Sequence, residues 1–194
     1  MVKKLMIGAV ALIAAGAAVA YVQRHEITLA MIEKVASKRM QDPIAALSDG
    51  LHVGLCGTGS PFPDPDRAAP CTLVIAGKDM FLFDAGSAAA KQIAGMGFST
   101  GQLKGVFITH FHSDHMDGLG EVLMTRWAQH TAGQPLTVHG PTGIAQVMNG
   151  FETAYQQDTG YRTAHHGAST MPPELAGAKT HEFEVEKGRY TTVL

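Results

Sequence analysis

From residue 51 onward, short apolar stretches alternate with longer segments in which apolar residues recur at helical spacing. The short stretches predict strands at 51–55, 72–76, 80–83, 106–109 and 136–139. The longer segments predict helices at 87–96, 118–129 and 142–155. Gly77 and Asp79 fall between the second and third strands and predict a hairpin there. Strands that alternate with helices predict an α/β layered domain.

Two flanking regions depart from this alternation. Residues 61–70 contain four prolines and must form a loop. Residues 25–41 have apolar positions at helical spacing and predict an amphipathic helix or linker, which Asp42-Pro43 interrupts. We therefore expect a helix or linker over 23–49 and a domain over 50–194, with residues 183–190 as a strand and the turn after it.

The first residues have the composition of a targeting segment. Lys3 and Lys4 precede an uncharged, mostly apolar stretch at 5–22, and Ala18-Val19-Ala20 is a small-x-small pattern that a signal peptidase can cut. The 18 residues of this stretch also approach the roughly 20 that span a bilayer as a helix. Residues 1–22 are thus predicted to be a cleaved signal peptide or a signal-anchor helix. Either alternative predicts a periplasmic or secreted domain, or one anchored to the inner membrane by residues 5–22.

Composition narrows the class of protein. The chain has 194 residues, enough for one domain of ordinary size, and a formal net charge of -2. A chain with this charge has no overall basic field that would attract nucleic acid. Cys56 ends one predicted strand and Cys71 begins the next, so the two form either a disulfide in an oxidising compartment or a pair of small buried thiols.

Candidate metal ligands follow the predicted strand at 106–109. His110, His112, Asp114 and His115 lie within six residues, between an apolar strand and Gly118. In extended backbone, residues two apart point to the same side. We therefore expect His110, His112 and Asp114 to share one side and His115 to point away, so that two pairs of ligands serve two neighbouring metal ions. Imidazole and carboxylate together favour zinc, with manganese or iron as alternatives.

This His-x-His-x-Asp-His motif resembles the signature of the metallo-β-lactamase superfamily. Three other stretches resemble parts of that family. The run from Gly57 to Pro61 is similar to the first loop of its ribonuclease Z-like and arylsulfatase-like members. Phe83-Asp84-Ala85-Gly86 is similar to its early aspartate turn, and His139-Gly140-Pro141 to the strand-to-helix step after the motif. The resemblance covers about residues 51–143.

The resemblance implies a fold, a site and a reaction. The fold is a metallo-β-lactamase αββα sandwich, of which this chain would supply roughly the N-terminal half, preceded by an N-terminal apolar helix. His110 and His112 would bind a first zinc ion, and Asp114 and His115 a second. Asp114 would also orient or deprotonate the attacking water, which makes it the candidate catalytic residue. Asp84 would steady a ligand imidazole from behind, or else serve only as a turn former.

The motif accounts for half of a dinuclear site. The family also uses a third histidine, an aspartate that bridges both metals and a last histidine, and none of these is identifiable before Leu194. We therefore interpret the chain as a fragment or a truncated product. We expect it to bind metal weakly, to hydrolyse little, and to expose the sheet face that would meet the second half.

The sequence predicts a metal-dependent hydrolase of an ester-type bond, which could be a phosphodiester, sulfate ester, lactone or thioester. The leader and the slightly acidic charge favour a small-molecule ester over RNA, so nucleic acid is predicted to be an unlikely partner. The alternative is an inactive membrane-tethered remnant, or a binding module, that keeps half of the site. His165 and His166 are candidate substrate contacts, or else surface histidines at a helix end.

Overall fold

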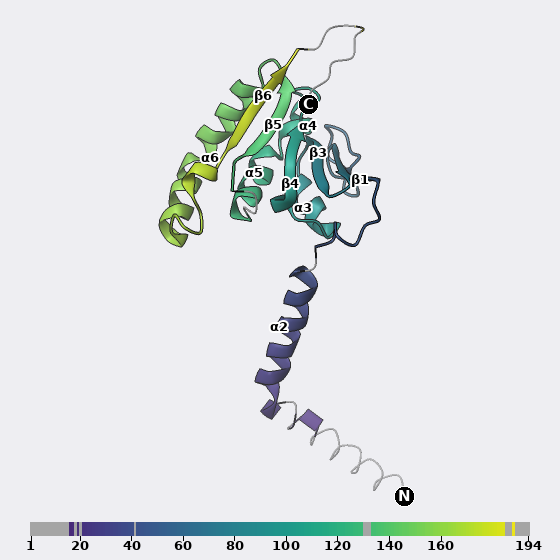
Figure 1. Cartoon of the computed structure of the whole chain (residues 1–194), viewed down its shortest axis with the longest axis vertical. Coiled ribbons are helices and arrows are strands. Elements are labelled where there is room, and N and C mark those ends of the chain that lie inside the picture. The colour runs from purple at the N-terminus through teal and green to yellow at the C-terminus, as the bar shows by residue number, and fades with distance from the viewer. Residues whose placement is uncertain are drawn as a thin grey trace, which may run out of the picture. The chain divides into compact units, whose positions relative to one another are not determined.

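The computed structural model describes residues 16, 17, 19, 21–40, 42–129, 133–184 and 188, and divides into two compact units, Met1–Asp42 and Pro43–Leu194 (Figure 1). The first unit contains helix α2 (Arg24–Met40), in agreement with the helix predicted at 25–41. Most of the predicted leader, residues 1–15 with 18 and 20, lies outside the described residues, and so does the expected N-terminal apolar helix. Within the described part of the chain, no helix combines the length and the apolar character that a bilayer crossing requires.

The second unit is built on one six-stranded sheet whose strand order follows the sequence. Its strands are β1 (Leu51–Gly57), β2 (Cys71–Ala76), β3 (Asp79–Ala85), β4 (Leu103–Phe107), β5 (Leu136–Pro141) and β6 (Ala178–Phe183). The first three strands are antiparallel, and β3 to β6 are parallel. The predicted hairpin is confirmed, because β2 and β3 pair around Gly77, whose φ of 59° suits a tight turn.

Helices cover one face of this sheet. They are α3 (Ala89–Gly95), α4 (Ser113–Met116), α5 (Leu119–Ala128) and α6 (Ile144–His166), with single 3₁₀ turns at Thr100–Gln102 and Pro173–Leu175. The buried core joins alternate residues of the strands, such as Leu82 and Val106, to helix residues such as Ile93 and Val122. This alternation puts every second strand residue under the helices. Figure 1 shows the long helix α6 running beside β5 and β6.

The structure differs from the predicted elements at three places. Strand β4 begins at Leu103 and ends at Phe107, so residues 108–112 precede a helix rather than extend a strand. Helix α6 continues to His166 instead of ending near residue 155. The last described strand, β6, occupies Ala178–Phe183, upstream of the strand predicted at 183–190, whose residues 185–187, 189 and 190 are not described.

The other face of the sheet carries a row of side chains that crosses all six strands. The strand register aligns Leu55, Thr72, Phe83, Phe107, His139 and His181. Phe107 stacks on Phe83 at 4.8 Å and on His139 at 4.5 Å between ring centroids. Leu55 is 67% exposed, and Val53 beside it is 60% exposed. Among the described residues this face is therefore left open at β1, as expected for one half of a sandwich.

His139 makes this sheet sensitive to acid. The ring is buried, its Nδ1 has no hydrogen-bond partner among the described residues, and the pKa is lowered below 6.5, first by burial and then by repulsion from His181. A lowered pKa means that the folded state prefers the neutral ring. The neutral His139 ring therefore makes its full contribution to the free energy of unfolding above pH 6.5, and this contribution is lost as the pH falls below that value.

We expect His139→Phe to reduce the loss of unfolding free energy between pH 8 and pH 5.5, because the variant keeps an aromatic ring but has no proton to bind at this position. Urea unfolding of parent and variant at both pH values measures the difference. Equal losses in the two proteins would contradict the assignment.

Cys56 and Cys71 form a disulfide with a Cα–Cα distance of 5.0 Å. Of the two alternatives that the sequence left open, the structure has the disulfide. The bond closes the proline-rich loop between β1 and β2, and that loop packs behind the candidate site, since the Gly86 amide donates to the Pro70 carbonyl at 3.0 Å.

Candidate metal centre

The candidate ligands gather where parallel strands end. Asp84 stands near the carboxyl end of β3, and the segment from Thr109 to His115 follows the carboxyl end of β4, the neighbouring strand. In open parallel sheets this edge is where ligands bind, because loops from adjacent strands meet there. The register of β3 and β4 therefore brings two motifs that are 25 residues apart into contact.

After β4 ends at Phe107, residues 108–112 form no regular secondary structure, and a short helix follows them. His112 has φ −68° and ψ 144° and stands at the N-cap of α4, which contains both Asp114 and His115. The expectation that Asp114 continues the extended row and that His115 points away is therefore wrong. A helical turn brings His115 back toward the first ligand, and its ring lies 4.1 Å from that of His110.

The four side chains meet as two pairs of donor atoms. His110 Nε2 and His112 Nδ1 are 3.1 Å apart. His115 Nε2 and Asp114 Oδ2 are 3.7 Å apart. Two ligands at about 2.05 Å from a tetrahedral zinc ion are separated by roughly 3.3 Å. Each pair thus has the spacing and the donor chemistry of two adjacent ligands of one metal ion.

Neither pair amounts to a complete metal site by itself. In the described part of the chain, no group of three or more His, Cys, Asp or Glu side chains converges on a common point. Two donors at each position leave the remaining coordination positions of a metal ion to other ligands. The residues present fit a metal ion to which this part of the chain contributes two donors at each position.

Asp84 connects the two pairs from behind. Its carboxylate, on a residue that is 8% exposed, accepts hydrogen bonds from the Thr109 amide at 2.8 Å and the Thr109 hydroxyl at 2.9 and 3.0 Å. It also faces His115 Nδ1 at 2.7 Å. Asp84 has φ 58°, a left-handed conformation that asparagine and aspartate adopt more readily than most residues. Asp84 was predicted as a site residue, whereas Thr109 was not, although this threonine directly precedes the first histidine.

Close backbone packing holds this arrangement. A Cβ at Gly86 would lie 2.2 Å from the Asp114 carbonyl, and one at Gly118 would lie 2.1 Å from the Gly86 carbonyl. The Gly118 amide donates to the Ala85 carbonyl at 2.8 Å. The glycines let the turn after β3 touch both ends of the motif segment, so that Asp84 and the ligands are fixed on one framework.

The structure does not bring His165 and His166 to this centre. The first turn of α6 is near the motif, because a Cβ at Gly143 would lie 3.3 Å from the Phe111 ring. The two histidines end the same helix, 22 residues after Ile144, and so stand roughly 33 Å along its axis. Their rings contact each other at 4.6 Å.

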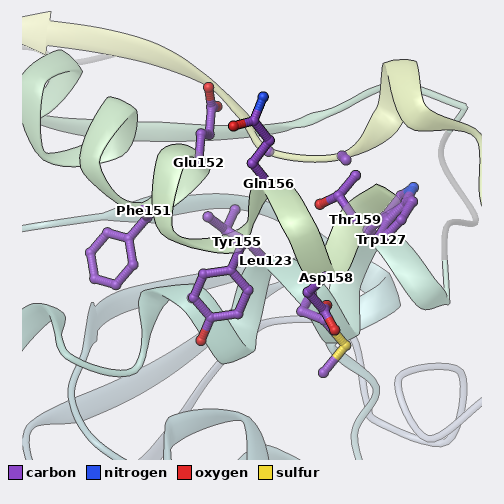
Figure 2. Close-up of a pocket in the computed structure, with 12 residues that line it drawn as sticks. Leu123, Trp127, Phe151, Glu152, Tyr155, Gln156, Asp158 and Thr159 are labelled. Carbon is purple, nitrogen blue, oxygen red and sulfur yellow. The ribbon is translucent and has the colours of Figure 1, made fainter. Parts of the chain in front are cut away.

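A cavity of about 220 Å³ lies between α5 and α6, away from the ligands. Figure 2 shows Trp127, Phe151 and Tyr155 around it, with Asp158 on the same helix as Tyr155. None of His110, His112, Asp114 or His115 lines this cavity. Its walls are mainly aromatic and aliphatic, and the described residues that line it include Glu152 and Asp158 but no histidine. We place the metal chemistry at the donor pairs because they combine imidazole nitrogens with a carboxylate.

Known proteins resemble this chain over the same region. Residues 51–146 match the family model described as anti-Pycsar protein Apyc1. Ribonuclease Z of Mycobacterium bovis is 44% identical over 135 residues, which are 69% of this chain and 47% of that protein. Human tRNase Z, short form, superposes with a TM-score of 0.52 at 25% identity. The superposition covers 70% of this chain and 46% of the human chain. A long form RNase Z from yeast superposes with a TM-score of 0.51 at 20% identity, over 71% of this chain and 18% of the yeast chain. This likeness indicates the fold alone. The chain spans about half the length of the curated relatives it matches.

These relatives overturn two expectations. Their name states RNA as the substrate, so the prediction of a small-molecule ester and of nucleic acid as an unlikely partner is wrong. The net charge of -2 is a sum over the whole chain and therefore says nothing about the charge at one local site. The prediction of an extracytoplasmic or membrane-anchored location is contradicted by the same ribonuclease relatives.

Proposed function

Because this chain belongs to the metallo-β-lactamase superfamily and is ribonuclease Z-like, we propose that it carries the N-terminal half of a metal-dependent phosphodiesterase site that acts on RNA. The observation that carries the proposal is the meeting of two donor pairs, His110 with His112 and Asp114 with His115, at the carboxyl edge of the parallel strands. The 44% identity to a ribonuclease Z supports the choice of a phosphodiester over the other ester bonds.

In this proposal each pair holds one metal ion, and zinc suits the donor set best. His110 and His112 offer two imidazole nitrogens to the first ion. His115 offers an imidazole nitrogen, and Asp114 a carboxylate oxygen, to the second. The bound ions supply Lewis acidity, which lowers the pKa of water and stabilises negative charge on the phosphate.

The side chains have separate tasks around that chemistry. Asp114 is the candidate catalytic residue, because an acceptor-only carboxylate next to the metal position can orient the attacking water and take its proton. Its side chain is only 10% exposed, which keeps the carboxylate aimed toward His115. Asp84 and Thr109 touch no substrate in this proposal and act by holding the histidines.

RNA is the proposed substrate class, with the phosphodiester as the reacting group. The described ligands contribute donors and little positive charge, so we expect the phosphate to be attracted mainly through the metal ions. This expectation separates the protein from nucleic-acid binders that rely on lysine and arginine clusters, and it is consistent with the net charge of -2.

Cleavage by the purified 194-residue chain tests the proposal. Three substrates distinguish the bond: a transfer-RNA precursor with a 3′ extension, bis(p-nitrophenyl) phosphate, and p-nitrophenyl sulfate. Each is assayed with added zinc or manganese and again with a chelator. We expect slow, metal-dependent cleavage of the two phosphodiesters and none of the sulfate ester. Cleavage of the sulfate alone, or phosphodiester cleavage that a chelator leaves unchanged, would contradict the proposal.

The rate should be low and the metal weakly held, because each ion receives two described ligands instead of the usual three or four. Calorimetric titration with zinc measures this directly. We expect dissociation constants in the micromolar range or weaker. Two tight sites would show that the described pairs do not limit metal binding.

A further inference from the structure

We infer that Thr109 is a positioning residue, which relays the Asp84 carboxylate to His110 and fixes the tautomer of that histidine. The inference rests on the proposed function only in assigning the free nitrogens to metal ions. The hydrogen bonds that carry it are those among Asp84, Thr109, His110 and His115.

The direction of each bond follows from the number of hydrogens available. A carboxylate only accepts, and the Thr109 hydroxyl oxygen Oγ1 lies 3.0 Å from Asp84 Oδ1 and 2.9 Å from Oδ2, so the single hydroxyl hydrogen is donated to that carboxylate. Once that hydrogen is donated to Asp84, the hydroxyl oxygen can only accept from His110 Nδ1, which is 2.9 Å away. His110 therefore carries its proton on Nδ1, and its Nε2 keeps the lone pair.

The same carboxylate fixes the tautomer of His115 through a direct hydrogen bond. His115 Nδ1 is 2.7 Å from Asp84 Oδ2 and must donate to it. His115 Nε2 is then the free nitrogen, and this is the atom that faces Asp114 Oδ2. One buried carboxylate thus prepares one ligand of each pair, through the threonine hydroxyl in the first case and without an intermediary in the second.

The relay from Asp84 to His110 requires a hydroxyl group at position 109. Thr109 is an exposed residue, so water competes for its hydroxyl. The Thr109 amide is also bound to Asp84 at 2.8 Å, which holds the backbone and leaves only the side-chain rotation to be fixed. A hydroxyl at this position is required, and a β-branched shape alone does not suffice. Thr109→Val and Thr109→Ser separate these two properties.

The first test measures tautomers in the metal-free protein. Long-range ¹H–¹⁵N spectra of the histidine rings at pH 8 report which nitrogen is protonated. In the parent we expect the Nδ1–H form for both His110 and His115. In Thr109→Val we expect His110 to shift toward the Nε2–H form that a free imidazole prefers, while His115 stays unchanged. Thr109→Ser should restore the parent form of His110.

The second test measures metal binding. We expect Thr109→Val to weaken zinc binding at the His110 pair by about 10-fold, within the range found when a residue behind a metal ligand is removed, and Thr109→Ser to stay within about threefold of the parent. Thr153→Val is the matched control, because its hydroxyl donates to the Asn149 carbonyl within α6, and it should leave both readouts unchanged.

Several results would overturn the inference. His110 in the Nε2–H form in the parent would do so without any variant, and therefore even if Thr109→Val failed to fold. An unchanged His110 tautomer in a folded Thr109→Val protein would do so as well. Failure of the proposed function would appear differently, as no cleavage and no metal binding by a parent whose two histidines still show the expected tautomers.

Discussion

Replacing His110 with alanine is expected to reduce metal-stimulated phosphodiester cleavage to the rate measured in the presence of a chelator. The imidazole supplies one of two donor atoms at the first metal position, 3.1 Å from His112 Nδ1. It also contacts the His115 ring at 4.1 Å. Its loss leaves a single donor at the first position and loosens a ligand at the second. We expect zinc affinity at the first position to fall by at least about 100-fold. This equals or exceeds the largest losses of affinity seen when a residue that only hydrogen-bonds a metal ligand is removed.

Calorimetry and the cleavage assay on parent and variant measure this together. His25→Ala is the matched control, because it removes an exposed imidazole from α2, in the other unit of the chain. It should bind and cleave as the parent does. A His110→Ala protein that keeps the zinc affinity and the rate of the parent would show that the first pair does not hold the reactive metal.

The order of strands and helices could be predicted because it depends on local periodicity. β1, β2, β3, α5 and β5 appear close to where alternating or helical patterns place them. The ends of elements were less predictable. β4 ends at Phe107, and two residues later the amide and hydroxyl of Thr109 donate to the Asp84 carboxylate, a partner 25 residues away in the sequence.

The candidate site was predictable as a set of residues, whereas its arrangement was not. A cluster of three histidines and an aspartate after an apolar strand can be recognised in the amino-acid sequence. The fold of that cluster onto Asp84 depends on the β3–β4 register and on α4, a single helical turn that no periodicity can reveal. The extended-backbone assumption therefore misplaced His115.

His165 and His166 show the opposite case. The sequence left them as either substrate contacts or surface histidines at a helix end, and neither of them lines the cavity between α5 and α6. The prediction of a helix ending near residue 155 left the distance to the motif open. The continuous helix to His166 fixes it, because each residue adds about 1.5 Å along the axis.

Gly118→Ala is expected to destabilise the second unit by about 1–3 kcal/mol, the usual cost of forcing extra atoms into a well-packed region. Alanine can adopt the backbone conformation of Gly118, φ −85° and ψ −4°, without strain. Any loss of stability therefore comes from steric contact of the new side chain. The new Cβ would lie 2.1 Å from the Gly86 carbonyl and 2.9 Å from that of Ala85, both backbone atoms. To relieve the contact, the turn after β3 must separate from the motif, which would also weaken the Gly118–Ala85 hydrogen bond.

Urea unfolding compares this variant with Gly160→Ala, the same chemical change in the middle of α6. Nothing lies within 4 Å of a Cβ at Gly160, so that alanine there should stabilise the protein by about 0.5–1 kcal/mol through its better helix propensity. Opposite signs for one substitution at two glycines would attribute the loss to the contact beside Asp84 and Asp114. Because that contact also positions the donor pairs, Gly118→Ala should weaken zinc binding under conditions in which the variant is still folded. Unaltered zinc affinity in a destabilised Gly118→Ala protein would mean that the framework supports the fold without positioning the ligands.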